Sequence, residues 1–234
     1  MELTEVPKPS VRDHALNIVK GLISSAPVPF ASGVAAEIFS IIITPPLQRR
    51  WEEWAESIAE GLVQLQEKVD GFSLEDLSEN ESFVTVVLKA THLAVRNHQQ
   101  EKVEALRNAV LNSALPGAPE DDLQLVFLDL VDTLTPWHLR VLKLFDDPLK
   151  WADQNQRTVP IGMGMASTGQ VLLQAYPELN GKGEFQAKII KDLSTYGLAE
   201  IPSAMMTSRG AHESRTSGFG KQFLQFLTTP RQLE

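Results

Sequence analysis

Five histidines are the side chains of this 234-residue chain with the most versatile chemistry, because histidine can act as a general base or bind a metal. They are His14, His92, His98, His138 and His212. No two stand at the i, i+4 spacing that places a pair of zinc ligands on one helix face. The chain has no cysteine, which excludes disulfides, thiol catalysis and thiolate zinc sites. We therefore expect no metal and interpret His138, at a predicted helix start, as structural.

Two other patterns could carry chemistry. Asp129 and Asp132 stand at i, i+3, where paired carboxylates can exchange protons or hold a metal, but they lie opposite an apolar stripe, where acids normally meet solvent. Gly162, Gly164 and Gly169 lack the spacing of a dinucleotide-binding loop and the Lys-Ser/Thr of a P-loop. The G-x-S-x-G turn of serine hydrolases is also absent. The sequence thus predicts no catalytic and no cofactor-binding residue, and a chain that is not an enzyme.

The N-terminal region is the most apolar part of the chain. It begins without a basic segment or an early apolar run, so we expect no secretory signal and a location in the bacterial cytoplasm. Residues 26–43 are apolar but are interrupted by Pro27, Pro29, Gly33 and Glu37. A membrane-spanning helix needs about 20 mostly apolar residues. We interpret this stretch as a buried helix, with a membrane-inserting hairpin as the alternative.

A long amphipathic helix is predicted from Pro45 to Val69. Thr44-Pro45 is a helix-start signal, and Gly71 is a stop signal. Apolar side chains recur at steps of three and four along this segment, on one face. They are Leu47, Trp51, Trp54, Ile58, Leu62, Leu65 and Val69. Core packing is the default for such a stripe, and Trp51 and Trp54 are candidates for a partner-binding stripe if they are not core.

Further helices are predicted as far as residue 155. Ser78 with Glu81 has the pattern of a capping box, and Thr135-Pro136 and Asp147-Pro148 are helix starts. Residues 156–169 are rich in glycine and turn residues and are expected to be a linker or loop. Residues 1–155 would then form a helical bundle.

Residues 170–234 show a different pattern. Short helices are predicted over 170–176 and 184–195, followed by a strand at 198–201, a polar loop, a return strand at 215–217 and a last helix from Ser217. Helix, helix, strand, loop, strand, helix is the order of a winged helix. The predicted fold is therefore mainly all-α, a helical bundle followed by a small winged-helix-like module with a short β-hairpin.

Charge is unevenly distributed along the chain, whose net charge is −9. Residues 51–120 contain five Lys or Arg and thirteen Asp or Glu, whereas residues 182–231 contain seven and four. The overall acidity argues against a protein that coats nucleic acid non-specifically. The C-terminal module offers a basic surface that could contact nucleic acid or a partner, and its candidate residues are Lys188, Lys191, Arg209, Arg215 and Lys221.

Three stretches together resemble a known group of proteins. They are residues 105–112, residues 127–142 with their Leu-Thr-Pro-Trp-His-Leu sequence, and Leu193 and Gly197-Leu198 followed by residues 216–223. In this order they resemble uncharacterised bacterial helical proteins, including the abortive-infection alpha (Abi-alpha-like) proteins. The resemblance covers roughly residues 80–227 and implies a helical body with a winged-helix-like end. It also implies a link to phage defence, and it supplies no catalytic residue.

These patterns favour a non-enzymatic interaction protein with a protein partner, as a component of bacterial phage defence or stress response. A winged-helix regulator that binds DNA through the basic module is the first alternative. A membrane-active effector using the N-terminal apolar helices is the second. A homo-oligomer is compatible with all three readings.

Overall fold

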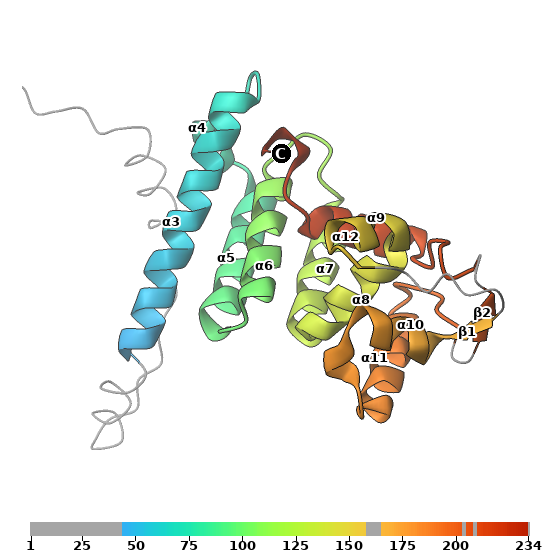
Figure 1. Cartoon of the computed structure of the whole chain (residues 1–234). Coiled ribbons are helices and arrows are strands. Elements are labelled where there is room, and N and C mark those ends of the chain that lie inside the picture. The colour runs from blue at the N-terminus through green and yellow to red at the C-terminus, as the bar shows by residue number, and fades with distance from the viewer. Residues whose placement is uncertain (1–43, 158–164, 203–204, 208–209, 234) are drawn as a thin grey trace, which may run out of the picture. The chain divides into compact units, whose positions relative to one another are not determined.

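A computed structural model describes residues 44–157, 165–202, 205–207 and 210–233. This part of the chain is mostly helical, with ten α-helices, two 3₁₀ turns and two three-residue strands (Figure 1). The expected all-α character is confirmed. The predicted helices within residues 1–43 lie outside the described residues.

The described chain divides into two compact units. The first contains residues up to Asp132 together with Phe226–Glu234, and the second contains Thr133–Gln225. The chain therefore passes from one unit to the other at Asp132–Thr133 and again at Gln225–Phe226. The sequence predicted one division after residue 155, with residues 170–234 in a single module. The difference arises because α8 (Pro136–Asp146) packs against α11 (Gly183–Thr195) and so belongs with the C-terminal elements.

The first unit is built around three helices that lie side by side, α3 (Thr44–Lys68), α5 (Glu81–Arg96) and α6 (Gln100–Ser113) (Figure 1). The short α4 (Leu74–Ser78) and α7 (Asp121–Thr133) complete its main helices. Its interior is aliphatic and aromatic, as the amphipathic pattern predicts. The largest buried side chains of this unit include Ile58, Leu62, Leu65, Phe83, Leu106, Leu111, Phe127 and Leu128.

The start of α5 differs from its prediction. Ser78 was expected to cap this helix, but Ser78 is the last residue of α4, which the sequence did not predict. The N-cap is Asn80, whose side chain accepts a hydrogen bond from the Phe83 amide at 3.0 Å. Asparagine caps a helix as well as serine does, and the two candidates are only two residues apart.

Amide side chains of α6 hold the C-terminal segment within the first unit. The Asn108 side chain donates to the Leu227 carbonyl at 3.1 Å, and the Asn112 side chain donates to the Phe226 and Thr228 carbonyls at 2.9 and 2.8 Å. These carbonyls lie at the end of α12 (Gly218–Leu227), where a helix leaves its last acceptors without intrahelical partners. The 3₁₀ turn at Arg231–Leu233 then packs against α3.

The second unit contains α8, α9 (Pro148–Gln154), β1 (Met165–Ser167), α10 (Thr168–Ala175), α11, β2 (Met205–Thr207) and most of α12. Asp147 caps α9 with Pro148 at its first position, as predicted. Ser167 caps α10 with Gln170 in a capping box, so the helix begins at Thr168, two residues before the predicted start. Buried side chains join these elements, and they include Leu142, Phe145, Leu172, Ile189, Leu193, Leu198 and Phe223.

The β structure of the second unit differs from the predicted hairpin. β1 pairs with β2 in antiparallel register, with Ala166 opposite Met206, and the two strands are far apart in sequence. The two segments predicted as strands, 198–201 and 215–217, meet in one isolated antiparallel bridge between Ala199 and Thr216. The sequence placed β1 in a linker and β2 in a loop, because three-residue strands are too short for an alternating pattern to reveal them.

Candidate functional site: the His138 cluster

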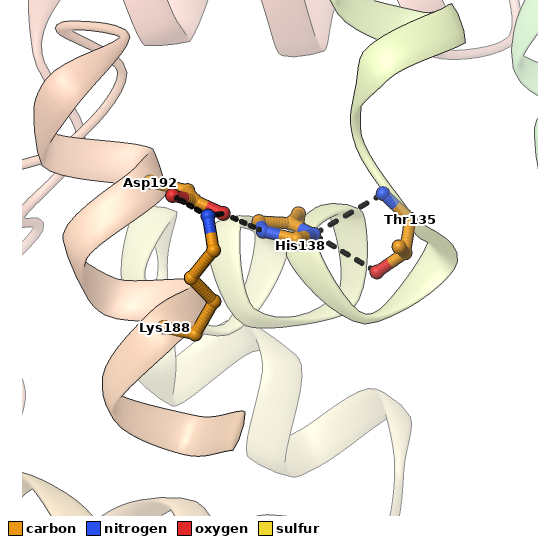
Figure 2. Close-up of polar contacts among 4 residues, drawn as sticks. All are labelled: Thr135, His138, Lys188 and Asp192. Atoms are coloured by element: carbon orange, nitrogen blue, oxygen red, sulfur yellow. Dashed lines mark hydrogen bonds and ion pairs between the residues drawn. The ribbon is translucent and has the colours of Figure 1, made fainter. Parts of the chain in front are cut away.

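A polar cluster in the second unit joins the first turn of α8 to α11. It consists of Thr135, His138, Lys188 and Asp192, and we call it the His138 cluster (Figure 2). Thr135 is the N-cap of α8 and Pro136 is its first residue, so the predicted Thr-Pro start is confirmed. His138 is the third helical residue, and its side chain turns back to the cap as Glu or Gln does in a capping box.

Both ring nitrogens of His138 have partners. The Thr135 amide donates to Nδ1 at 3.1 Å, and the Thr135 hydroxyl oxygen lies 2.9 Å from the same nitrogen. Nε2 lies 3.2 Å from Oδ2 of Asp192. Because Nδ1 accepts a hydrogen from the backbone, the proton of the neutral ring must be on Nε2, which then donates to the carboxylate. The geometry therefore selects one neutral tautomer of His138.

Asp192 connects this histidine to a lysine on the same helix. Lys188 lies one turn before Asp192 on α11, and its Nζ donates to Oδ2 at 2.6 Å. The Lys188 side chain is 65 % exposed, so this ion pair is largely open to water, whereas the Asp192 side chain is 19 % exposed. Asp192 is thus the central member of the cluster, and it satisfies a buried ring on one side and a surface ammonium on the other.

The surroundings move the pKa values of both ionisable centres. Burial is the largest influence on His138 and lowers its pKa, against the opposing hydrogen bond with Asp192. For Asp192, burial alone would raise the pKa. Hydrogen bonds from Lys188 and His138 outweigh it and hold that pKa below its usual value. Near neutral pH the cluster therefore consists of a neutral imidazole, a carboxylate and an ammonium group.

This arrangement resembles the histidine–carboxylate pair of many hydrolases, but its chemistry differs. A general base needs one ring nitrogen with a free lone pair that a substrate can reach. In His138 that nitrogen already accepts the Thr135 amide, and the residue is only 5 % exposed. The ring can orient and connect helices, but in this conformation it has no lone pair to offer a substrate. This geometry agrees with the structural role that the sequence suggested for His138.

The residues of the predicted basic surface of the second unit differ in their surroundings. Lys191 on α11 and Lys221 on α12 are exposed, as a contact surface requires. Lys188 is also exposed, but its charge is paired with Asp192. Arg209 lies outside the described residues. All three lysines therefore lie on the surface, as predicted. They differ in charge, because the charge of Lys188 is balanced by Asp192.

Arg215 differs most from its predicted role. Its backbone amide donates to the Phe145 carbonyl at 2.7 Å, and its guanidinium donates to the Gly210 carbonyl at 3.0 Å. Its Nε is buried, and the side chain is 27 % exposed. Arg215 ties the loop after β2 to the end of α8, so its guanidinium is already engaged in a contact within the unit. A single basic residue in a loop gives no signal in sequence that distinguishes these two roles.

The two tryptophans of the α3 stripe also differ in their surroundings. Trp54 is 2 % exposed, and its indole Nε1 donates to the Thr91 hydroxyl at 2.9 Å, so it is a core residue of the first unit. Trp51 is half-buried at the edge of this stripe. Trp54 was a candidate for partner binding only if it was not part of the core, so it is no longer a candidate. Its buried indole found the hydroxyl partner that such a side chain needs.

The two aspartates singled out on α7 differ in their contacts. The Asp129 carboxylate forms an ion pair with Lys89 at 2.7 Å. Asp132 is exposed, and its backbone carbonyl accepts from the buried Lys102 ammonium at 2.8 Å. His92 and His98 are exposed on the first unit. Among the described residues, no group of three or more histidine, aspartate or glutamate side chains could hold a metal ion.

Asp192 was not identified as a functional residue from the sequence. A local signal was present, since Lys188 and Asp192 have the i, i+4 spacing of helical ion pairs. The contact between His138 and Asp192 spans 54 positions and depends on how α8 packs against α11. The sequence holds no local signal for that contact.

In comparisons with known proteins, the chain matches no protein-family model, no curated protein and no solved structure. The candidate membrane segment, residues 26–43, lies outside the described residues. Within the described ranges, no helix is both long and apolar enough to cross a membrane.

Proposed function

We propose that this chain is a non-enzymatic interaction protein whose second unit is a winged-helix-like module that contacts another protein. The observation that carries the proposal is the charge balance on α11, the helix that would read DNA in a winged helix. Abortive infection or stress response in bacteria is the proposed setting, and it rests on the resemblance of the sequence to Abi-alpha-like proteins.

The order of elements supports the winged-helix-like reading. β1 follows α8 and the short α9, and α10 and α11 come after it. α11 is the last helix before the bridge and β2, which is the place of the third helix in a winged helix. The Ala199–Thr216 bridge and β2 come after it, where a winged helix has its strands and wing. In such a module the third helix is the one that enters the major groove of DNA.

The outward side of α11 does not have the charge of a DNA-reading helix. Its charged side chains are Glu184, Lys188, Lys191 and Asp192, two positive and two negative. DNA-binding proteins gain most of their affinity from cations that neutralise phosphates, and they read bases with Arg, Lys, Asn and Gln. Gln186, the one amide side chain on this helix, is buried and donates to the Leu179 carbonyl at 2.8 Å.

The same helix has features that suit a protein partner. Phe185 and Ile190 are half-buried at its two flanks, Ala187 and Ser194 are small and exposed, and Tyr196 at its C-terminal end is 38 % exposed. Aromatic and apolar side chains surrounded by polar ones are typical of the centre of protein interfaces. We therefore assign protein contact to the outward side of α11.

The DNA-binding regulator is the second candidate function, because Lys191 and Lys221 are both exposed on helices of this module. Titration of labelled upstream DNA separates the two candidates. The test variant is Lys191→Glu with Lys221→Glu, since neither lysine belongs to the His138 cluster. The matched control is Lys68→Glu with Lys143→Glu, two exposed lysines on α3 and α8 whose reversal changes the net charge equally.

The proposal predicts a dissociation constant of about 10⁻⁴–10⁻⁶ M at physiological salt, the non-specific range, with a similar small weakening in both variants. Nanomolar binding by the wild type, lost in the test variant and kept in the control, would overturn the proposal in favour of the regulator.

A further inference from the structure

The hydrogen bond from the Thr135 amide to His138 can form only while the ring is neutral. Its Nδ1 accepts the Thr135 amide, while its Nε2 faces the Asp192 carboxylate (Figure 2). A protonated ring carries a hydrogen on both nitrogens. It can still donate to Asp192, and its Nδ1–H can donate to the Thr135 hydroxyl oxygen 2.9 Å away, but the Thr135 N–H then has no acceptor on the ring.

Protonation thus affects the two ends of the ring in opposite ways. On the Asp192 side it replaces a neutral donor with a charged one, which strengthens the contact. On the Thr135 side it removes the only acceptor that the ring offers to the N-cap amide. Thr135 is the third residue of the second unit, where the chain enters this unit from α7.

We propose that His138 is an acid-sensitive fastening of the first turn of α8: the neutral ring accepts the hydrogen bond from the Thr135 amide, and the protonated ring gives up that hydrogen bond. The Asp192 contact persists in both states, so α11 keeps hold of the ring while the N-cap loosens. This inference is independent of the partner proposed above, because it concerns the hydrogen bonds of the second unit alone.

The charged groups that face the ring are Asp192 and Lys188, both on α11, and no other charged side chain of the described ranges acts on it. Asp192 favours proton uptake, whereas Lys188 and burial oppose it. Because burial is the largest influence, the pKa of His138 is lowered and the fastening stays closed at neutral pH. Because Asp192 raises the pKa of His138 and Lys188 lowers it, replacing Lys188 should shift the titration of the ring in a known direction.

The test is amide hydrogen exchange of the full chain, read by NMR as protection factors from pH 7.5 downward, together with the ring resonances of His138. The Thr135 amide should lose protection about tenfold, the equivalent of one net hydrogen bond. The midpoint of that loss should coincide with the titration of the ring. Protection of amides in the middle of α11 should remain.

Three variants make the test specific. His138→Gln keeps the capping-box acceptor and does not titrate, so its Thr135 protection should be independent of pH. Lys188→Met removes a nearby positive charge at a side chain that is 65 % exposed, and it should move the midpoint to higher pH. The control, His92→Gln, removes an exposed histidine of the first unit and should behave as the wild type does.

Each result decides the proposal. It is supported if Thr135 protection follows the ring titration in the wild type and in Lys188→Met but not in His138→Gln. It is overturned if the ring titrates while Thr135 stays protected, if His138→Gln loses protection with the same midpoint, or if the ring does not titrate before the second unit unfolds.

Discussion

The carboxylate of Asp192 lies 3.2 Å from the imidazole Nε2 of His138, and this contact joins α11 to the first turn of α8 across 54 positions of sequence. A buried ring nitrogen that carries a proton needs an acceptor, and Asp192 is that acceptor. The carboxylate is in turn neutralised by Lys188. One residue therefore completes the capping of α8 and reduces the positive charge available on α11.

Replacing Asp192 should cost more stability than replacing its lysine partner. Asp192→Ala leaves the buried Nε2–H of His138 without an acceptor, and we expect a loss of about 1–3 kcal/mol in the free energy of unfolding of the second unit. Lys188→Ala removes only an exposed ion pair and should cost about 0–1 kcal/mol. Urea denaturation followed by circular dichroism measures both. Equal losses would show that the Lys188 pair, rather than the buried ring, makes Asp192 important.

The stability of the second unit should depend on pH through His138. Its pKa is lowered in the folded state, so the unfolded chain binds a proton first as the pH falls below about 6.5. Stability is therefore fully present above that value and decreases toward the folded-state pKa, by at most about 1.4 kcal/mol per pH unit for one proton. Asp192 contributes separately and at lower pH, because its own pKa is held below its usual value.

Urea midpoints at pH 7.5, 6.5 and 5.5 measure this effect, and His138→Gln is the comparison. The wild type should lose stability over this range more steeply than His138→Gln does. Parallel curves for the two proteins would mean that His138 does not contribute to the acid sensitivity.

Leu62 tests the core of the first unit. It lies on the buried face of α3 and is 2 % exposed. Leu62→Ala should destabilise this unit by about 2–5 kcal/mol, the usual range for a truncated core leucine. Gln64→Ala, two residues away on the exposed side, is the control and should change the urea midpoint little. An unchanged midpoint for Leu62→Ala would contradict the core assignment of the stripe.

Gly220 tests the packing of the first turn of α12. A Cβ atom at this position would overlap the carbonyl oxygen of Leu198, a backbone atom that cannot turn away. Gly220→Ala should therefore destabilise the second unit by about 1–3 kcal/mol, as other overpacked sites do. Gly218→Ala is the matched control at the start of the same helix, where an added Cβ meets nothing within 4 Å. It should be neutral or slightly stabilising, and an equal loss in both variants would contradict the clash.

The helices of this protein could be predicted from its sequence where start signals and amphipathic spacing coincide. Thr135 with Pro136 and Asp147 with Pro148 mark their helices correctly, because a cap and the fixed φ of proline act locally. The β structure could not be predicted as well. β1 and β2 pair across 38 or more positions with three residues each, which leaves no periodic pattern to detect.

The sequence predicted which basic residues belong to the candidate surface. It could not predict which of them are already bound to other groups of the chain. Lys188, Lys191 and Arg215 are all basic residues of the second unit, yet only the tertiary structure shows that one pairs with Asp192 and another binds a backbone carbonyl. Similarly, His138 could be placed at a helix start from the sequence, whereas its acceptor on α11 could not. Contacts of this kind depend on how helices pack, which residue types alone do not determine.

The tautomer of His138 tests the central claim most directly, because the claim is that both ring nitrogens are occupied by structural hydrogen bonds. Two-bond ¹H–¹⁵N correlation spectra at pH 7.5 distinguish a protonated ring nitrogen from an unprotonated one. We predict a single neutral form of His138 with the proton on Nε2, while the exposed His92 and His98 serve as internal controls and show averaged signals. A His138 ring that is charged at pH 7.5, or that carries its proton on Nδ1, would contradict the account, since Nδ1 could not then accept the Thr135 amide.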